Sequence, residues 1–390
     1  MKDNSTENGL CSVLQHHDLQ LSDRPPVTKL PINEIEGFHF LRSIFSILIV
    51  AIKTNLMLIA EILVSSSFAL ILTANVAYLA VPVFFQISLF LFYLKSESKG
   101  LLYFVQKRLP KLTLLYLFWV GLKVLFDILI KGEFETLREA ALSARTLIEF
   151  IVSGGQSIFF FLFSLLILNL MAAFLMTHFK KVKQPQGKTL IAYGFLFASC
   201  SFVFLCKIAE TIATHVTDDP MKTPTVLANV AFWDFNPLNF LPYLFTALIT
   251  FQELKQGTMR VWSTRLKLKS CILFTLFLGF TLIEWQLFDK QLHYARLSLI
   301  FGSWLLLDLA IMSRLKVPAV IKFFSAFSLG IYGYHIFVAE SLTLSSSNIL
   351  AGVLNTYPGL EVLFVFLASL LGAIALTIVS KRVKYLKNFV

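Results

Sequence analysis

The sequence predicts an all-α protein, a polytopic membrane bundle of about ten transmembrane helices with both termini in the cytoplasm. Of its 390 residues, 57% are hydrophobic and 15% are charged, whereas soluble proteins are about 45–50% apolar and 25% charged. Apolar runs of about 20 residues, long enough for a helix to cross a bilayer, recur along the chain. The residue alternation of a membrane barrel is missing. A third observation, the placement of the basic residues, sets the orientation.

The predicted spans follow from the length of each apolar run. Residues 1–36 are polar and contain three prolines, which predicts a disordered cytoplasmic tail. Residues 37–390 form one transmembrane domain. Its spans are predicted at 40–61, 75–94, 111–130, 157–178, 189–211, 238–254, 269–288, 295–313, 322–345 and 360–380.

Basic residues gather in alternate loops of this predicted bundle. The loops after the second, fourth, sixth and eighth spans are basic, and so is the C-terminus, while the opposite loops are acidic or mixed. By the positive-inside rule the basic loops are cytoplasmic. The net charge of +11 therefore does not indicate a nucleic-acid partner. The outer segment 133–150 has a helical period and mixed charge, which predicts a short amphipathic helix on the membrane surface.

Several other classes of protein lack support. The four cysteines have neither metal-ligand spacing nor a secreted disulfide pattern, so no metal site is predicted. GxSxG, HExxH, P-loop and GxGxxG motifs do not occur. The absence of a defensible internal repeat counts against an inverted-repeat transporter.

Two cations interrupt the first long apolar run, Gly37 to Glu61. Arg42 and Lys53 are eleven positions apart, so on a helix they share one face and lie roughly 16 Å apart along the axis. This places Lys53 near mid-bilayer, where an ionisable side chain costs about 2.5–3.5 kcal/mol or more and should face the bundle interior or a wet cavity. Lys53 is therefore either a functional residue or a structural partner of a buried acid. The candidate acids are Glu61, Asp127, Glu284 and Asp308.

Further polar side chains fall inside predicted spans. His335 lies in SLGIYGYHIFVAESL, five positions before Glu340. An intramembrane histidine can accept a proton, although a hydrogen-bonded core histidine is the alternative. Gln86 and Ser88 in the second span could line a cavity, or Ser88 could bond its own backbone.

A cluster of cations occurs at the predicted cytoplasmic face. Such a cluster can hold a polyanion such as a nucleotide phosphate. The alternative is that these residues only set topology and contact lipid head groups. The members are Arg42, Lys107, Arg108 and Lys111.

Four stretches together resemble the acyltransferase-3 family of integral membrane acyltransferases. They are FLRSIFSILIVAIK, VPVFFQISLFLFYLKSESKGLLYFVQKRLPKLTLLYLFW, FNPLNFLPYLFTALI and FFSAFSLGIYGYHIFV. Each motif alone is weak, and their order and spacing over roughly residues 37–380 carry the resemblance. Residues 37–390 are thus an acyltransferase-3-like transmembrane domain.

The resemblance implies transfer of an acyl group, often acetyl from acetyl-CoA, to a hydroxyl of a cell-envelope glycan or lipid. Arg42 corresponds to the family's arginine near the cytoplasmic acyl-CoA entry. Arg108 and Lys111 fall on its Arg-x-x-Arg pair, and His335 falls on the histidine of its last motif.

The chain also departs from the family pattern. Lys53 stands where the opening helix of the family has a histidine, and Leu89 stands where its second span has a glycine. Gln156 stands where a histidine is expected before the fourth span. The family's histidine chemistry cannot run unchanged at Lys53, although a desolvated lysine can serve as a base.

We therefore expect a membrane O-acyltransferase in the bacterial plasma membrane. Acyl-CoA is the expected co-substrate, held by Arg42, Arg108 and Lys111, with no bound cofactor, no metal and no nucleic acid. Transfer to an extracytoplasmic glycan or lipid is expected near Lys53 and His335, and membrane lipids surround the protein. One alternative is a non-catalytic relative that assists polysaccharide binding or export. The other is a transporter in which Lys53 and His335 relay protons.

Overall fold

A computed structural model describes residues 35–179, 181–182, 184–216, 235–259, 262–288, 292–345 and 358–390. Its contacts divide the chain into Met1–Ile35 and Glu36–Val390, and the account below concerns the second unit. The predicted tail covers residues 1–36, and residues 1–34 of it lie outside the described residues.

All regular secondary structure in the described residues is helical, which confirms the predicted fold class. Each predicted span falls on a helix, and seven helical stretches are long and apolar enough to cross a membrane. Because α12 and α14 have only 15 and 16 residues, the count of ten spans stays a prediction, as does the side of the termini. The main helices are α2 (Glu36–Lys53), α3 (Leu58–Leu63), α4 (Ser66–Asn75), α5 (Ala80–Tyr103), α6 (Leu109–Phe126), α9 (Phe160–Phe179), α10 (Pro185–Val216), α12 (Leu241–Lys255), α13 (Thr264–Leu287), α14 (Leu297–Met312), α15 (Ala319–Ser345) and α17 (Pro358–Arg382).

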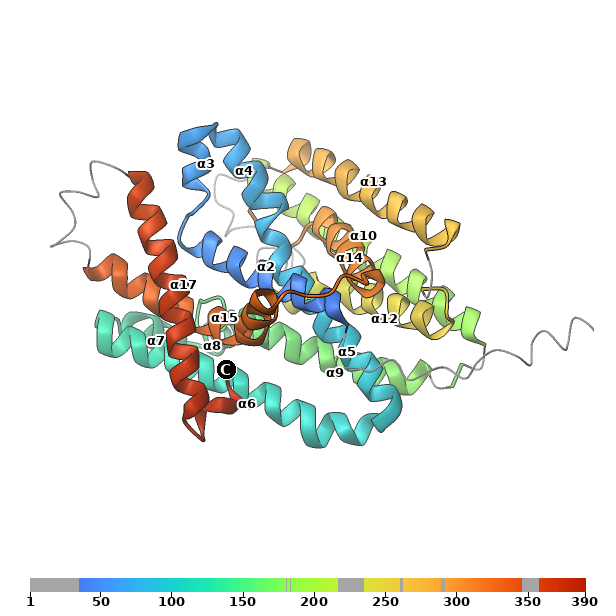
Figure 1. The fold of residues 1–390 in the computed structure, drawn as a ribbon, viewed down its shortest axis with the longest axis horizontal. Coiled ribbons are helices and arrows are strands. Elements are labelled where there is room, and N and C mark those ends of the chain that lie inside the picture. The colour runs from blue at the N-terminus through green and yellow to red at the C-terminus, as the bar shows by residue number, and fades with distance from the viewer. Residues whose placement is uncertain are drawn as a thin grey trace, which may run out of the picture. The chain divides into compact units, whose positions relative to one another are not determined.

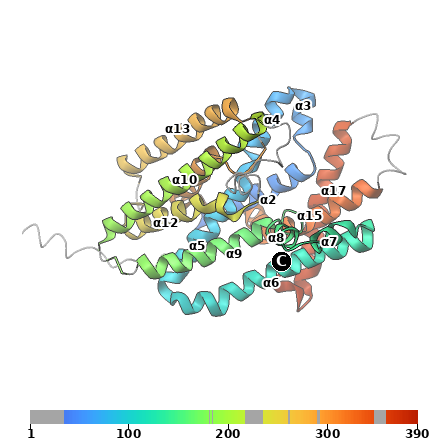
Figure 2. The ribbon, with the colours of Figure 1, turned by 180° about the vertical axis from the view of Figure 1, so that it is seen from behind.

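The helices pack in a continuous series. Figures 1 and 2 show α10, α12, α9 and α6 following one another across the bundle, with α5 between α12 and α9, while α13 packs against α14. α2 packs against α14 and α15, and α15 packs against α17. Small residues allow that last approach, because a Cβ added at Gly330 would lie 2.1 Å from Thr377 Oγ1. α2 and α15 therefore form the part of the bundle on which the candidate site is built.

The first helix ends earlier than the apolar run predicts. α2 stops at Lys53, and Asn55 follows in the left-handed region with φ 53°. Leu56 N donates to Ala51 O at 2.9 Å, the long-range bond of a Schellman motif. The prediction of one continuous span over 40–61 is therefore wrong, because run length ignores a polar Thr-Asn pair that caps a helix.

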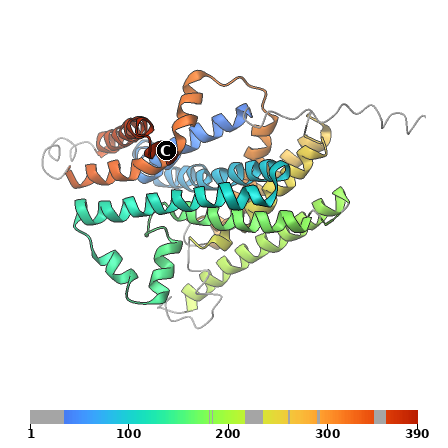
Figure 3. The ribbon, with the colours of Figure 1, turned by 90° about the horizontal axis from the view of Figure 1, so that it is seen from below.

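The outer segment 133–150 forms two short helices instead of one. α7 covers Glu135–Ala140 and α8 covers Ala144–Val152. Figure 3 shows them as two separate helices that follow α6. Ser143 interrupts the segment, because its side chain caps α8 in a reciprocal capping box with Thr146. The segment is helical as predicted, but the N-cap at Ser143 divides it into two helices.

A buried ion pair joins α13, α14 and α4. The side chains of Arg296 and Glu284 are both 0% exposed, and Arg296 Nε lies 2.9 Å from Glu284 Oε2. The other guanidinium nitrogens donate to Ala74 O at 2.9 Å and to Asn75 Oδ1 at 2.7 Å. Ser298 donates to the carboxylate through both its backbone N–H and its hydroxyl. Glu284, one of the acids considered as a partner of Lys53, is thus occupied by Arg296.

Candidate functional site

Four charged side chains form a cluster at the end of α6 and on α15. We call Lys123, Asp127, Lys131 and Glu340 the ion cluster. Asp127 Oδ1 lies 2.5 Å from Lys123 Nζ and 3.1 Å from Lys131 Nζ, since both lysines are four positions from it on one helical face. Glu340 Oε2 lies 2.8 Å from Lys131 and 3.4 Å from Lys123. The cluster therefore ties α15 to the π-helical turn Asp127–Lys131 that follows α6.

Lys53 lies beside this cluster. It is the last residue of α2 and its side chain is exposed, so it does not face the bundle interior, the first of the two surroundings expected for it. A wet cavity is the other, and the depth of Lys53 in the membrane stays a prediction. Glu340 attracts its charge, while Lys123 and Lys131 repel it. Asp127 and Glu133 also pair with Lys131, at 3.1 and 3.9 Å, so three lysines face three carboxylates at this end of the bundle. The attracting carboxylate was not among the four acids proposed from the sequence.

His335 is a buried imidazole with one nitrogen unused. Its side chain is 0% exposed, and Nδ1 lies 2.9 Å from Ile331 O. Because a carbonyl oxygen only accepts, Nδ1 carries the proton, and the lone pair of a neutral imidazole is then on Nε2. Nε2 has no hydrogen-bond partner among the described residues. The charge of Lys53 acts on this ring, so the structure brings the two predicted catalytic residues into one region.

The loop before α9 is fixed to α15 close to the buried histidine. Gly154, Gly155 and Gln156 all have positive φ, of 63°, 70° and 53°. The Tyr332 hydroxyl donates to the carbonyl oxygen of Ile158 in this loop. Gln156, at the position where the resemblance expects a histidine, is exposed. A non-glycine residue in the left-handed region is a form of strain that clusters at functional sites.

Trp119 of α6 packs against α15 two residues before His335. Its ring lies against the backbone of Gly333, where an added Cβ would be 2.1 Å from Cη2. It also stacks on Phe159, with ring centroids 5.6 Å apart, and meets Tyr334 edge-on at 4.9 Å. The indole Nε1 is buried and has no hydrogen-bond partner in the part of the chain that the structure describes. These contacts pack Trp119 tightly between α15 and the loop before α9.

Arg108 is held firmly at the predicted cytoplasmic end. Its guanidinium donates to Asn169 Oδ1 at 3.2 Å, and to Ser88 Oγ at 3.0 Å. It also lies 5.8 Å from the centroid of the Phe92 ring. Ser88 therefore positions Arg108. Lys111 is exposed one turn beyond.

Arg42 is a half-buried guanidinium with free donors. It makes no hydrogen bond or ion pair with any residue that the structure describes, although its charge acts on His39. One turn earlier, Phe38 meets Phe90 of α5 edge-on, with ring centroids 5.8 Å apart. Phe90 lies within the same two turns of α5 that hold Arg108. Both arginines thus belong to elements packed on this part of α5, and no direct bond joins them.

Gln86 lies in the core between α5, α12 and α14. Its side chain is fully buried, and Nε2 donates to Thr246 Oγ1 at 2.7 Å and lies 3.5 Å from Ser303 Oγ. Its Oε1 has no partner among the described residues. Gln86 therefore joins three helices and keeps one acceptor free.

These features define a class of protein: a helical membrane bundle with a buried histidine on α15 and arginines at α2 and at the start of α6. A neutral imidazole can take a proton from a hydroxyl, and a guanidinium without a partner can bind a phosphate. No group of three metal-ligating side chains occurs in the described ranges.

The chain belongs to the acyltransferase-3 family. The family model described as an acyltransferase domain matches residues 35–378, from the residue before α2 almost to the end of α17. This confirms the resemblance, and the protein is an integral membrane acyltransferase. Neither the curated proteins nor the solved structures contain a match to the chain.

Proposed function

We propose that this acyltransferase moves an acyl group, acetyl in the first instance, from acyl-CoA to a hydroxyl of an extracytoplasmic cell-envelope glycan or lipid. The plasma membrane of a bacterium is the proposed location. The observation that carries the proposal is His335, a buried neutral imidazole whose Nε2 lone pair is unused. A base in this state is what the deprotonation of a hydroxyl requires.

The proposed donor site lies at the cytoplasmic end. The free guanidinium of Arg42 binds a phosphate of acyl-CoA, and Arg108 and Lys111 add positive charge nearby. Charge-assisted hydrogen bonds from a guanidinium to a phosphate are strong and can be bidentate. Arg108 keeps its position because Ser88 and Asn169 hold it.

The proposed transfer takes place near His335. Nε2 takes the proton of the acceptor hydroxyl, and the oxygen attacks the carbonyl carbon of the thioester. The C–S bond then breaks, and the imidazolium returns the proton to the thiolate of CoA. The carbonyl of Ile331 orients the ring throughout and stabilises the imidazolium. Lys53, whose charge acts on the ring, stabilises the negative charge that develops on the carbonyl oxygen.

The test is transfer of radiolabelled acetyl from acetyl-CoA in membranes that contain the wild type or a variant. His335→Gln should lower transfer to the glycan or lipid fraction by about 10²–10⁴-fold, the usual contribution of a general base. His178→Gln is a matched control, because His178 Nδ1 also lies 3.0 Å from a carbonyl four residues earlier but the ring is exposed. Arg42→Gln should raise the KM for acetyl-CoA more than it lowers kcat. Full activity of His335→Gln would refute the proposed role of the ring.

A second candidate rests on Lys53, which replaces the histidine of the family. In that case the protein binds or helps to export a polysaccharide without transferring an acyl group. Label that appears only with Lys53→His would favour this candidate. Label with the wild type, but not with Lys53→Ala, would favour an enzyme that uses Lys53. Succinyl-CoA is the second donor to test if acetyl-CoA gives no label.

A further inference from the structure

A cavity of about 500 Å³ lies between α10, α12, α13 and α14. Volumes of 300–1,000 Å³ are typical of small-molecule sites. Its lining includes none of the residues proposed for transfer. Those lie on α2, on α15 and at the start of α6, so the cavity is a separate site.

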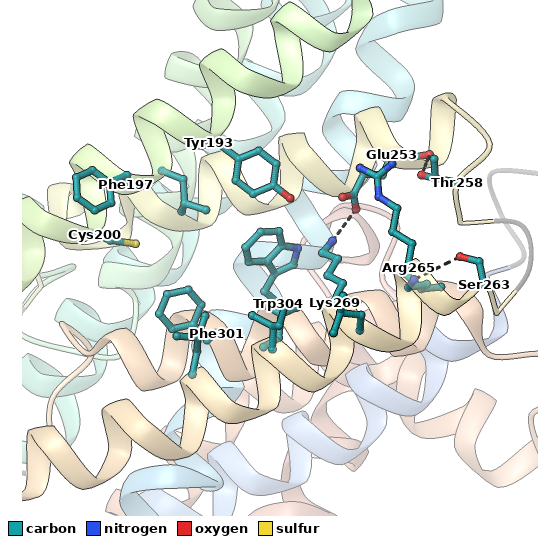
Figure 4. A pocket seen from close by; sticks show the side chains of 16 residues that line it. Tyr193, Phe197, Cys200, Glu253, Thr258, Ser263, Arg265, Lys269, Phe301 and Trp304 are labelled. Atoms are coloured by element: carbon teal, nitrogen blue, oxygen red, sulfur yellow. Dashed lines mark hydrogen bonds and ion pairs between the residues drawn. The ribbon is translucent and has the colours of Figure 1, made fainter.

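The polar end of this cavity holds two cations, Lys269 and Arg265, and of these two only Lys269 forms ion pairs with described residues. Lys269 Nζ lies 2.6 Å from Glu253 Oε2, 2.7 Å from Asp308 Oδ2 and 4.6 Å from the centroid of the Trp304 ring. Arg265, one turn earlier on α13, makes no ion pair or hydrogen bond with the described part of the chain. Figure 4 shows Lys269 and Arg265 extending from α13 toward Glu253 on α12. A cationic group with free donors thus stands at the mouth.

The rest of the cavity is apolar and opens toward lipid. Its rim includes Phe197, Leu268 and Ile272, which are 76%, 60% and 50% exposed. α13 forms one wall, and only 11% of its most apolar stretch is buried, so this helix lies at the edge of the bundle. The deeper lining consists of Leu196, Cys200, Leu273, Leu276 and Phe301.

The dimensions of the cavity match one leaflet. From Arg265 to Leu276 is eleven residues of α13, or roughly 16 Å along the helix axis. This is about half of the ~30 Å thickness of a bilayer's hydrocarbon core. A phosphate at Arg265 would therefore lie at the leaflet surface while an attached chain reached toward the midplane.

We infer that this cavity binds one phospholipid of the cytoplasmic leaflet, with its phosphate at Arg265 and one acyl chain along α13. A soluble phosphate compound would gain nothing from the exposed apolar rim. A purely apolar lipid would leave the guanidinium without a partner. The phosphate of a phospholipid would pair with Arg265, and its acyl chain would cover the apolar lining and rim.

Native mass spectrometry of the full-length protein tests this inference. The protein is delipidated in detergent and mixed with micelles that contain phosphatidylglycerol and phosphatidylethanolamine. The wild type should retain one phospholipid, and Arg265→Gln should retain at least tenfold less. Lys267→Gln is the matched control, because Lys267 is an exposed cation on the same helix outside the cavity lining. Leu276→Trp fills the apolar end and should also lose the lipid.

Equal retention by all four proteins would overturn the inference. So would displacement of the lipid by inorganic phosphate or coenzyme A, which would assign the cavity to a soluble ligand. Loss in Leu276→Trp without loss in Arg265→Gln would refute the phosphate position. Arg265 is exposed, so its substitution should leave folding intact and keep the test decisive. None of these outcomes depends on acyl transfer.

Discussion

Substitution of Arg296 by Met should be among the most destabilising single changes in the helical unit. The side chain it removes is fully buried and pairs with the equally buried Glu284 at 2.9 Å. The substitution leaves that carboxylate without its cation and deprives Ala74 O and Asn75 Oδ1 of a donor. Breaking a buried ion pair from one side costs about 3–5 kcal/mol. That is a large part of the ~5–15 kcal/mol by which folded proteins are stable.

The assay is thermal unfolding of the purified protein in detergent. At about 2 °C per kcal/mol, the lower end for larger domains, Tm of Arg296→Met should fall by about 6–10 °C. Arg138→Met is the matched control, because Arg138 pairs with Glu135 at 3.5 Å with both side chains 75% exposed. A surface pair of that kind is worth about 0–1 kcal/mol.

The double variant Arg296→Met/Glu284→Gln distinguishes two causes of the lost stability, the unpaired carboxylate of Glu284 and the lost packing contacts of Arg296. Since it leaves no carboxylate without a partner, it should be more stable than Arg296→Met alone. If the double variant unfolds at the same temperature as the single one, or the single one matches the Arg138→Met control, the reasoning is refuted.

Three further predictions concern stability and the site. Gly333→Ala places a Cβ 2.1 Å from Trp119 Cη2, so it should cost about 1–3 kcal/mol or more; the added substitution Trp119→Phe should restore part of the lost Tm, and an unchanged Tm in Gly333→Ala would contradict the packing. Burial lowers the pKa of His293, in the loop between α13 and α14, from its usual 6.5 to about 2. Below pH 6.5 the unfolded ring gains a proton while the folded ring stays neutral, so stability should fall by up to about 1.4 kcal/mol per pH unit. His293→Gln should flatten the Tm–pH curve, and equal slopes would exclude this cause. Tyr332→Phe removes the hydrogen bond to Ile158 O, so it should lower kcat. The free energy of unfolding should fall by no more than the ~1 kcal/mol of one hydrogen bond. An unchanged kcat would show that the position of the loop does not matter for the reaction.

The apolar runs were sufficient to predict a helical membrane protein, because backbone hydrogen bonds must be satisfied within a bilayer. They could not predict where α2 ends. Thr54 and Asn55 occupy only two positions in a run that is mostly apolar, and hydropathy averages them away. The Schellman motif that they form makes Lys53 the exposed last residue of α2.

The sequence pointed to Lys53 but not to the ion cluster beside it. Lys123 and Asp127 are an i,i+4 pair inside the third predicted span, a signal that was available and was missed. The contact of Glu340 with Lys131 joins positions far apart in the chain, so no local pattern contains it. The pairing of Glu284 with Arg296 depends in the same way on how α13 and α14 come together.

The length of α2 has a consequence for the choice of donor. Arg42 and Lys53 are on one uninterrupted helix, so the roughly 16 Å between them cannot change unless the helix breaks. In the proposed reaction, Arg42 holds the charged end of the donor and the region of Lys53 receives its reactive end. The opening helix then acts as a rigid spacer of fixed length. The helix would then select donors by the distance between their phosphate and their thioester, whatever acyl group they carry.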